Sequence, residues 1–171
     1  MHLIARLACL VALLGTVAAV QANCKPLLDA IDKLAQQSRF AAYEVDRPEQ
    51  PPAAEPDTVI IGKVGYVRSG KDWERVDMGA IASDHMNQHW KDLRKEITSN
   101  NVACSAAGTG SHRGATIHKF RYDGGTQGSA QLESGTVWID PRSGLIVYEG
   151  TARGGVYLVF GDAVKEPAVR K

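Results

Sequence analysis

The chain has 171 residues, of which 44% are hydrophobic and 23% charged, and its formal net charge is +1 at neutral pH. This length suffices for one domain with a substantial core. Because the charges balance, the chain has no overall attraction to nucleic acid or to anionic lipid, so we expect neither nucleic-acid binding nor a stable membrane anchor.

Residues 1–22 predict a cleaved secretory signal. One positive charge, Arg6, precedes an unbroken small and apolar run from Leu7 to Val20. The run is shorter than the roughly 20 residues that a membrane-spanning helix needs. It closes on Val20-Gln21-Ala22, a small-x-small pattern that signal peptidases cut.

A lipoprotein site at Cys9 is not predicted, because Arg6 stands where that motif needs Leu or Val. We therefore expect a soluble mature protein of residues 23–171, forming a single domain in the periplasm.

Cleavage leaves two cysteines, Cys24 and Cys104. In an oxidising compartment an even pair indicates one disulfide, worth about 4 kcal/mol in the loop-entropy model. A metal site built on these thiols would need His or Cys at close spacing, and the sequence has none beside them. We predict the disulfide and no metal.

The first element of the mature chain is a helix over Pro26–Gln37. Pro26 suits a first helical turn, and Leu27, Ile31 and Leu34 recur at helical spacing.

A strand over Arg39–Asp46 follows this helix. The next segment, Arg47–Asp57, carries four prolines and no apolar period, which predicts a loop joining two strands.

The middle of the chain predicts a hairpin and a second helix. Thr58–Arg68 is rich in β-branched residues and is expected to bend at Gly62 and Gly65. A tight turn leads into the second arm, Trp73–Met78. A helix over Ile81–Thr98 then presents Met86, Trp90, Leu93 and Ile97 within a narrow arc.

From Gly114 onward the pattern alternates strands with glycine-containing turns. The expected strands are Ala115–Tyr122, Ala130–Asp140, Leu145–Tyr148 and Val156–Phe160. Short connections favour antiparallel pairing, so the predicted fold is α+β, with helices covering one face of a curved sheet.

Two histidines, His85 and His89, share one face of the second predicted helix. Zinc hydrolases use this i, i+4 spacing, but their motif has a glutamate directly after the first histidine, and Met86 stands there. We interpret His89 as an edge of the core and His85 as solvated, and predict no metal site.

The glycine-rich segment Gly108–Gly114 is predicted to be a flexible turn. Its third glycine comes one residue late for a dinucleotide-binding loop, and it leads from a helical region into a strand rather than the reverse.

No catalytic site and no cofactor are predicted. No serine lies in a Gly-x-Ser-x-Gly turn, and no acid is placed to orient His112 or His118. The carboxylates Asp140, Glu149 and Asp162 fall in different turns and form no evident acid–base pair. The basic groups of Arg113–Arg121 are interpreted as a solvated strand face.

The order of several short motifs resembles a known family. Trp73-Glu74-Arg75 follows a glycine-bearing strand, and Cys104 follows a helix. The later motifs are a strand opened by Gly114, then Val137-Trp138-Ile139-Asp140, Ser143-Gly144-Leu145 and Phe160-Gly161-Asp162-Ala163-Val164 with Pro167 beyond. Over Thr58–Pro167 the chain is similar to the periplasmic lipoprotein-carrier-like superfamily, the relatives of LolA and LolB.

The resemblance implies a half-open antiparallel β-barrel, with two or three helices covering its concave face and an apolar cavity that shelters acyl chains. No residue can be matched to an acyl-chain contact of the family, so the ligand-binding residues stay unknown. The leading function is a non-enzymatic binder of a lipid-like or other apolar ligand. Two alternatives stay open: an inhibitor or immunity-type protein that acts on a protein partner through its surface, and a hydrolase.

Overall fold

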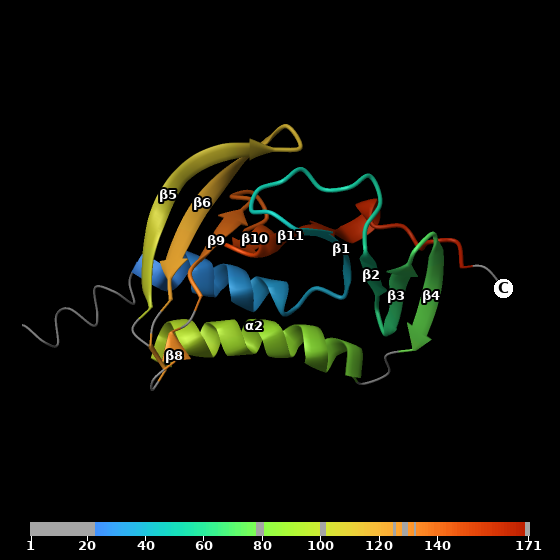
Figure 1. Cartoon of the computed structure of the whole chain (residues 1–171), viewed down its shortest axis with the longest axis horizontal. Helices are drawn as coiled ribbons and strands as arrows, with labels where there is room; N and C mark the ends of the chain where they lie inside the picture. Colours follow the sequence, from blue (N-terminus) through green and yellow to red (C-terminus); the bar gives the residue numbers. More distant parts are fainter. Residues whose placement is uncertain are drawn as a thin grey trace, which may run out of the picture.

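A curved antiparallel sheet and two helices make up the described part of the chain (Figure 1). The computed structural model describes residues 23–77, 81–99, 102–124, 126–127, 130–131 and 133–169. The predicted signal segment, residues 1–22, lies outside these ranges. The predicted α+β class is confirmed.

The main sheet has nine strands in the order β4-β3-β2-β1-β11-β10-β9-β6-β5, and its neighbouring strands pair antiparallel. Strands β4 and β5 form opposite edges, so the sheet is not closed. The strands are β1 Arg39–Val45, β2 Thr58–Ile61, β3 Val64–Ser69, β4 Asp72–Asp77, β5 Ala103–His112, β6 Ala115–Asp123, β9 Gly135–Ile139, β10 Ile146–Thr151 and β11 Gly154–Phe160. A separate ribbon pairs β7 Thr126–Gln127 with β8 Ala130–Gln131, and the 3₁₀ turn η1 Gly161–Ala163 follows β11.

Both helices pack on the same face of the sheet. The first helix covers residues 23–34 and the second, α2, covers Ile81–Ser99. Their directions in Figure 1 are opposite, and β5 and β6 arch around them. Within the described residues, neither helix combines the length and the apolar character that crossing a membrane requires.

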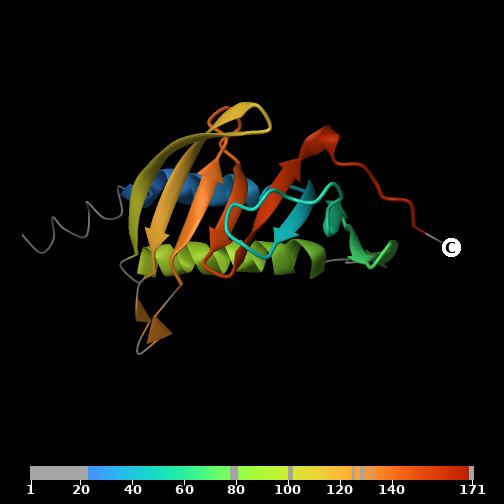
Figure 2. The same ribbon diagram turned by 45° about the horizontal axis from the view of Figure 1, so that its top comes forward.

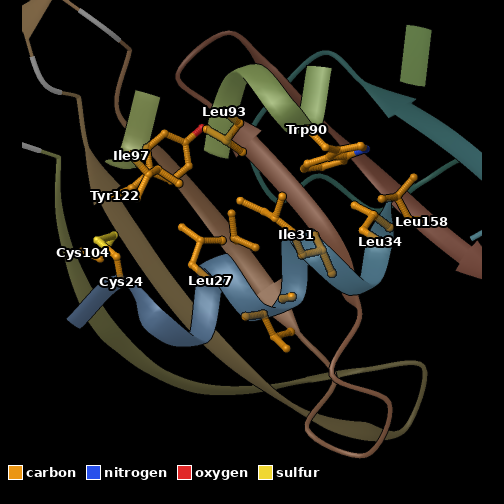
Figure 3. Packing of buried hydrophobic residues seen from close by; sticks show 14 of the residues in the cluster. Cys24, Leu27, Ile31, Leu34, Trp90, Leu93, Ile97, Cys104, Tyr122 and Leu158 are labelled. Carbon is orange, nitrogen blue, oxygen red and sulfur yellow. A yellow bond between two sulfur atoms is a disulfide. The ribbon is translucent and has the colours of Figure 1, made fainter. Parts of the chain in front are cut away.

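The apolar stripes of the two helices meet over the sheet, as their spacing predicted. Leu27, Ile31 and Leu34 of the first helix are buried there, and so are Trp90, Leu93 and Ile97 of α2 (Figure 3). Trp90 is only 3% exposed. The side chain of Met86, which belongs to the predicted stripe, lies outside the described residues.

The predicted disulfide is present. Cys24 and Cys104 are bonded with their Cα atoms 5.0 Å apart. The bond joins the start of the first helix to β5, the strand that follows α2 (Figure 3). It therefore fastens the helical layer to one edge of the sheet.

The prediction of a flexible turn over Gly108–Gly114 is wrong. Residues 108–112 belong to β5, and the turn is only Arg113–Gly114, both with positive φ (51° and 75°). A register shift between Ala106 and Thr109 bends the strand, and Gly108 has φ 92° within it. These small residues have weak β-propensity, and their pairing with β6 makes them a strand.

Two other predicted strands divide. Thr58–Arg68 is not one bent strand, because β2 and β3 form a hairpin around Gly62, whose φ is 62°. Ala130–Asp140 separates into β8 and β9. In the first case the two halves pair with each other. In the second, β8 pairs with β7 and β9 pairs with β6.

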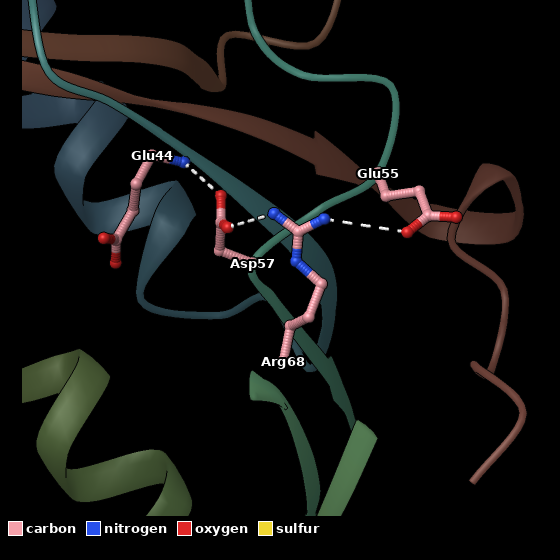
Figure 4. Close-up of polar contacts among 4 residues, drawn as sticks. All are labelled: Glu44, Glu55, Asp57 and Arg68. Carbon is pink, nitrogen blue, oxygen red and sulfur yellow. Dashed lines mark hydrogen bonds and ion pairs between the residues drawn. The ribbon is translucent and has the colours of Figure 1, made fainter. Parts of the chain in front are cut away.

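The proline-rich loop between β1 and β2 is fixed at its exit by Asp57 (Figure 4). The Asp57 carboxylate accepts hydrogen bonds from the Glu44 backbone N–H (2.9 Å) and from Arg68 (2.7 Å). Glu55 lies 3.6 Å from the same guanidinium. Figure 2 shows the loop crossing in front of the central strands, on the sheet face away from the first helix. The loop is an ordered strap rather than a linker.

The C-terminal segment also covers this outer face. Val164 packs with Ala41, Val59 and Tyr66. Its carbonyl oxygen accepts hydrogen bonds from Arg39, at 3.0 and 3.2 Å. The outer face of β1–β3 is thus buried by the chain's own tail.

Candidate functional site

The space between the helices and the sheet is filled by an apolar core. Leu158 of β11 lies there beside Leu34 and Trp90 (Figure 3). Glu149 is a buried acid in this layer. The Tyr122 hydroxyl donates a hydrogen bond to its Oε1 at 3.3 Å. Figure 3 shows the Tyr122 hydroxyl next to Leu93. The resemblance implied an apolar cavity at this place, and among the described residues the space holds packed side chains instead.

A hollow of about 310 Å³ lies at one end of the sheet, where β9 turns into β10 and β5 turns into β6. We call it the end hollow. Its apolar walls include four side chains that are only partly buried: Leu145, Val147, Val159 and Phe160. Its volume falls at the lower end of the range for small-molecule sites.

The end hollow adjoins both apolar layers of the molecule. One of its lining residues, Leu158, is 2% exposed and packs its side chain in the core below the helices. Another, Ile117, is 1% exposed and belongs to the cluster on the opposite face of the sheet.

One rim of the end hollow is the turn between β9 and β10. Asp140 accepts hydrogen bonds from the Arg142 backbone N–H (3.0 Å) and the Ser143 hydroxyl (3.1 Å), and the Arg142 Nε lies 3.5 Å away. Burial raises the pKa of Asp140, but these hydrogen bonds and the charge of Arg142 outweigh it, so the pKa lies below its usual value. Lys33 of the first helix donates to the Ser143 carbonyl at 3.2 Å, which holds the turn against the helix.

The other rim is the β5–β6 hairpin turn, with His112 and Arg113. The His112 ring stacks on Tyr157, with centroids 5.2 Å apart. Burial and the neighbouring Arg113 charge lower the pKa of His112, so the ring is neutral at pH 7. The Arg113 guanidinium lies 5.5 Å from the centre of the Tyr43 ring, a cation–π contact.

An aromatic cluster supports this rim from the outer face. Trp138, Tyr148 and Tyr157 pack with centroid distances of 4.6–5.7 Å. Lys119 lies 4.4 Å from the centre of the Trp138 ring and 2.9 Å from Glu49 of the strap loop, so it is not a solvated strand residue. The Glu49 backbone N–H donates to the Tyr148 hydroxyl at 2.8 Å. Burial raises the pKa of Tyr157 to about 12, so the cluster is uncharged at neutral pH.

Two further hollows have different linings. One, of about 270 Å³, is lined by Pro48, Tyr148, Ala152 and two glycines together with polar residues that include Arg121 and Glu49. The other, of about 370 Å³, lies beside the disulfide and is formed by Pro26, Phe120 and small residues of β5. The end hollow differs from both in that two arginines, Arg113 and Arg142, line it, whereas the first of these hollows has one arginine beside Glu49 and the second has none among the described residues.

The acids and histidines considered from the sequence lie in separate places. Asp140 lies in the β9–β10 turn, Glu149 in the interior and Asp162 on the exposed η1 turn.

His112 lies on a rim of the end hollow, whereas His118 is exposed on β6. The side chains of His85 and His89 lie outside the described residues. Where side chains are described, three or more His, Cys, Asp or Glu residues do not gather into a group that could hold a metal.

The end hollow was not predicted from the sequence. Its apolar residues come from the start of β10 and the end of β11, and its rims come from two turns of the chain. The sequence predicts a glycine-containing turn between the strands that end at Asp140 and begin at Leu145, but nothing in the spacing indicates that the Arg113 turn lies across the hollow from it.

No protein-family model matches the chain, and no curated protein sequence matches it. Among solved structures, the chain is similar to the lipoprotein LppX of Mycobacterium tuberculosis, with 15% identity over 86% of this chain and 97% of that one and a TM-score of 0.47. It is also similar to LprF from Mycobacterium bovis, with 13% identity over 88% and 97% of the two chains and a TM-score of 0.46. At these values we take neither ligand nor function from either protein.

Proposed function

We propose that this chain is an exported, non-enzymatic protein that binds an apolar, lipid-like ligand, and that the ligand enters through the end hollow. The observation that carries the proposal is the grouping of Leu145, Val147, Val159 and Phe160 around one hollow. Apolar side chains left partly exposed in a concavity are typical of a ligand-binding surface. Leu158 continues this lining into the core below the helices.

Export is part of the same proposal. The signal-like residues 1–22 and a disulfide at Cys24, directly after them, both suit an oxidising compartment. We propose a mature protein of residues 23–171 that acts in the periplasm as one domain of the lipoprotein-carrier-like type, without a cofactor.

Binding is tested with an uncharged apolar fluorophore, 1-N-phenylnaphthylamine, titrated into the purified protein. Val147→Asp places a charge in the apolar wall and is expected to weaken binding about tenfold or more. The matched control is Val67→Asp on β3, where the wild-type side chain is already 44% exposed and the affinity should not change.

A second variant, Val147→Trp, fills the hollow without adding a charge and should also reduce binding. Lipid extraction and mass spectrometry of the purified protein give an independent measurement, with a co-purifying acyl species as the expected result. Absence of fluorophore binding, or equal binding by the Val147 and Val67 variants, would overturn the proposal.

A further inference from the structure

The end hollow combines apolar walls with two cations on opposite rims. Arg113 follows β5 and Arg142 follows β9, and both line the hollow together with Val147 and Phe160. The predicted mature sequence as a whole has 19 basic and 19 acidic residues, so this pairing of cations with an apolar wall is a local feature.

Both arginines are carried on ordered turns. Arg113 has φ 51°, and its side chain rests against Tyr43. The turn that carries Arg142 is closed by hydrogen bonds to Asp140 and held by Lys33. Because the backbones of both turns are already ordered, only the arginine side chains lose conformational freedom when an anion binds.

The acid of the hollow does not cancel both charges. Asp140 is directed at its own turn, where it accepts from the Arg142 backbone and from Ser143. The Arg142 Nε lies 3.5 Å from the Asp140 carboxylate, and the Arg142 side chain is 77% exposed, so it stays accessible to an anion. His112 is neutral at pH 7 and adds no charge. The rim is therefore net positive.

We infer that the end hollow selects an amphiphile with an anionic headgroup, whose apolar chain lies against Leu145, Val147, Val159 and Phe160 and whose head is bound by Arg113 and Arg142. This inference rests on the proposed function and specifies its ligand class. Carboxylate and phosphate heads both fit guanidinium donors, because each presents two oxygens to a planar N–H pair. Cationic and uncharged heads on the same chain lack this interaction.

The test is calorimetric titration of the purified full chain with three probes below their micelle concentrations: dodecanoate, dodecyltrimethylammonium and dodecyl maltoside. The three share one alkyl chain and differ in head charge. We expect dodecanoate to bind about tenfold tighter than the other two, and this preference to fall in 0.5 M salt. Dodecyl phosphate, titrated in parallel, separates a carboxylate site from a phosphate site.

The double variant Arg113→Asn, Arg142→Gln should bind all three probes with similar affinity. Asparagine tolerates the positive φ of the hairpin turn, so the fold is retained, and an unchanged melting temperature verifies this. Arg142→Lys keeps a charge at the rim and should restore part of the preference. The matched control removes two positive charges from exposed turns elsewhere, Lys71→Gln with Arg153→Gln, and should leave the preference intact.

The outcomes separate this inference from the proposed function. Equal binding of the three probes by the wild-type protein would overturn the headgroup selection while leaving apolar binding in place. A dodecanoate preference that survives in the Arg113–Arg142 double variant would overturn its assignment to this rim. Failure of all three probes and of the uncharged fluorophore would overturn both.

Discussion

At the residue scale, the outer face depends on glycines that make room for tyrosine rings. The Tyr148 ring lies over Gly150 and Gly155, and a Cβ at either position would overlap its hydroxyl or ring carbons. In the core below the helices, Gly135 likewise leaves space for the Tyr122 ring. These glycines serve packing, because none of the three is among the residues with positive φ.

Gly150→Ala is therefore expected to lower the free energy of unfolding by about 1–3 kcal/mol, as for other overpacked sites. Urea unfolding followed by fluorescence measures the change. In the Tyr148→Phe background the closest atom, the hydroxyl, is absent, so the same alanine should cost less. An equal cost in both backgrounds would show that the tyrosine is not the cause.

His112 makes a pH-dependent contribution to stability. Its folded-state pKa lies below the unfolded value of about 6.5, because burial and Arg113 disfavour the protonated ring. The contribution is complete above pH 6.5, and it is lost as the pH falls through 6.5 toward the folded-state pKa, since only the unfolded chain gains the proton in that range.

We therefore expect the melting temperature to fall between pH 7.5 and pH 5.5, and His112→Phe, which keeps a ring against Tyr157, to reduce that fall. His118→Gln, at an exposed position on β6, is the control and should keep the wild-type slope. A slope unchanged by His112→Phe would contradict the assignment.

At the scale of elements, one disulfide and two segments packed on the outer face hold the layers together. The two segments are the strap loop 46–57 and the C-terminal tail. The strap loop 46–57 is fixed by Asp57 at its exit and by Glu49 at its centre. The tail is fixed on the outer face by Val164. On the opposite face, the Cys24–Cys104 bond joins the first helix to β5, across 80 residues of sequence.

Replacing both cysteines, Cys24→Ser with Cys104→Ser, should lower the free energy of unfolding by about 4 kcal/mol, because the unfolded chain regains the freedom of a long closed loop. The urea midpoint measures this. Wild-type protein in reducing agent should show the same shift, whereas the double variant should not respond to reducing agent. A wild-type midpoint that is insensitive to reduction, or two free thiols in protein recovered from the periplasm, would contradict the prediction.

At the scale of the whole molecule, the fold sets the outer aromatic cluster apart from the core below the helices. Strand alternation sends Trp138 to the outer face while Val137 and Ile139 face the helices. Both layers come together at the sheet end, where Leu158 of one and Ile117 of the other line the end hollow. This meeting point makes the end hollow the apolar site best placed to admit a ligand.

The sequence by itself determined the features that depend on local order. Helical spacing placed the buried stripe of Trp90, Leu93 and Ile97, and the proline content placed the loop between β1 and β2. The two cysteines that follow the predicted signal indicated their bond. Each of these sequence signals is contained in one short segment of the chain or in the number of residues of one type. The α+β class follows from the same signals, since it needs only the kinds of element and the short connections between them.

Only the tertiary structure decided what depends on pairing between distant segments. β5 is a strand because β6 lies beside it, although its small residues have weak β-propensity. The division of Thr58–Arg68 into β2 and β3 likewise depends on their pairing and on the pairing of β2 with β1. Arg113 and Arg142 line one hollow from opposite rims because the sheet curves between β5 and β9, and a curvature that brings two turns together leaves no periodic signal in the sequence.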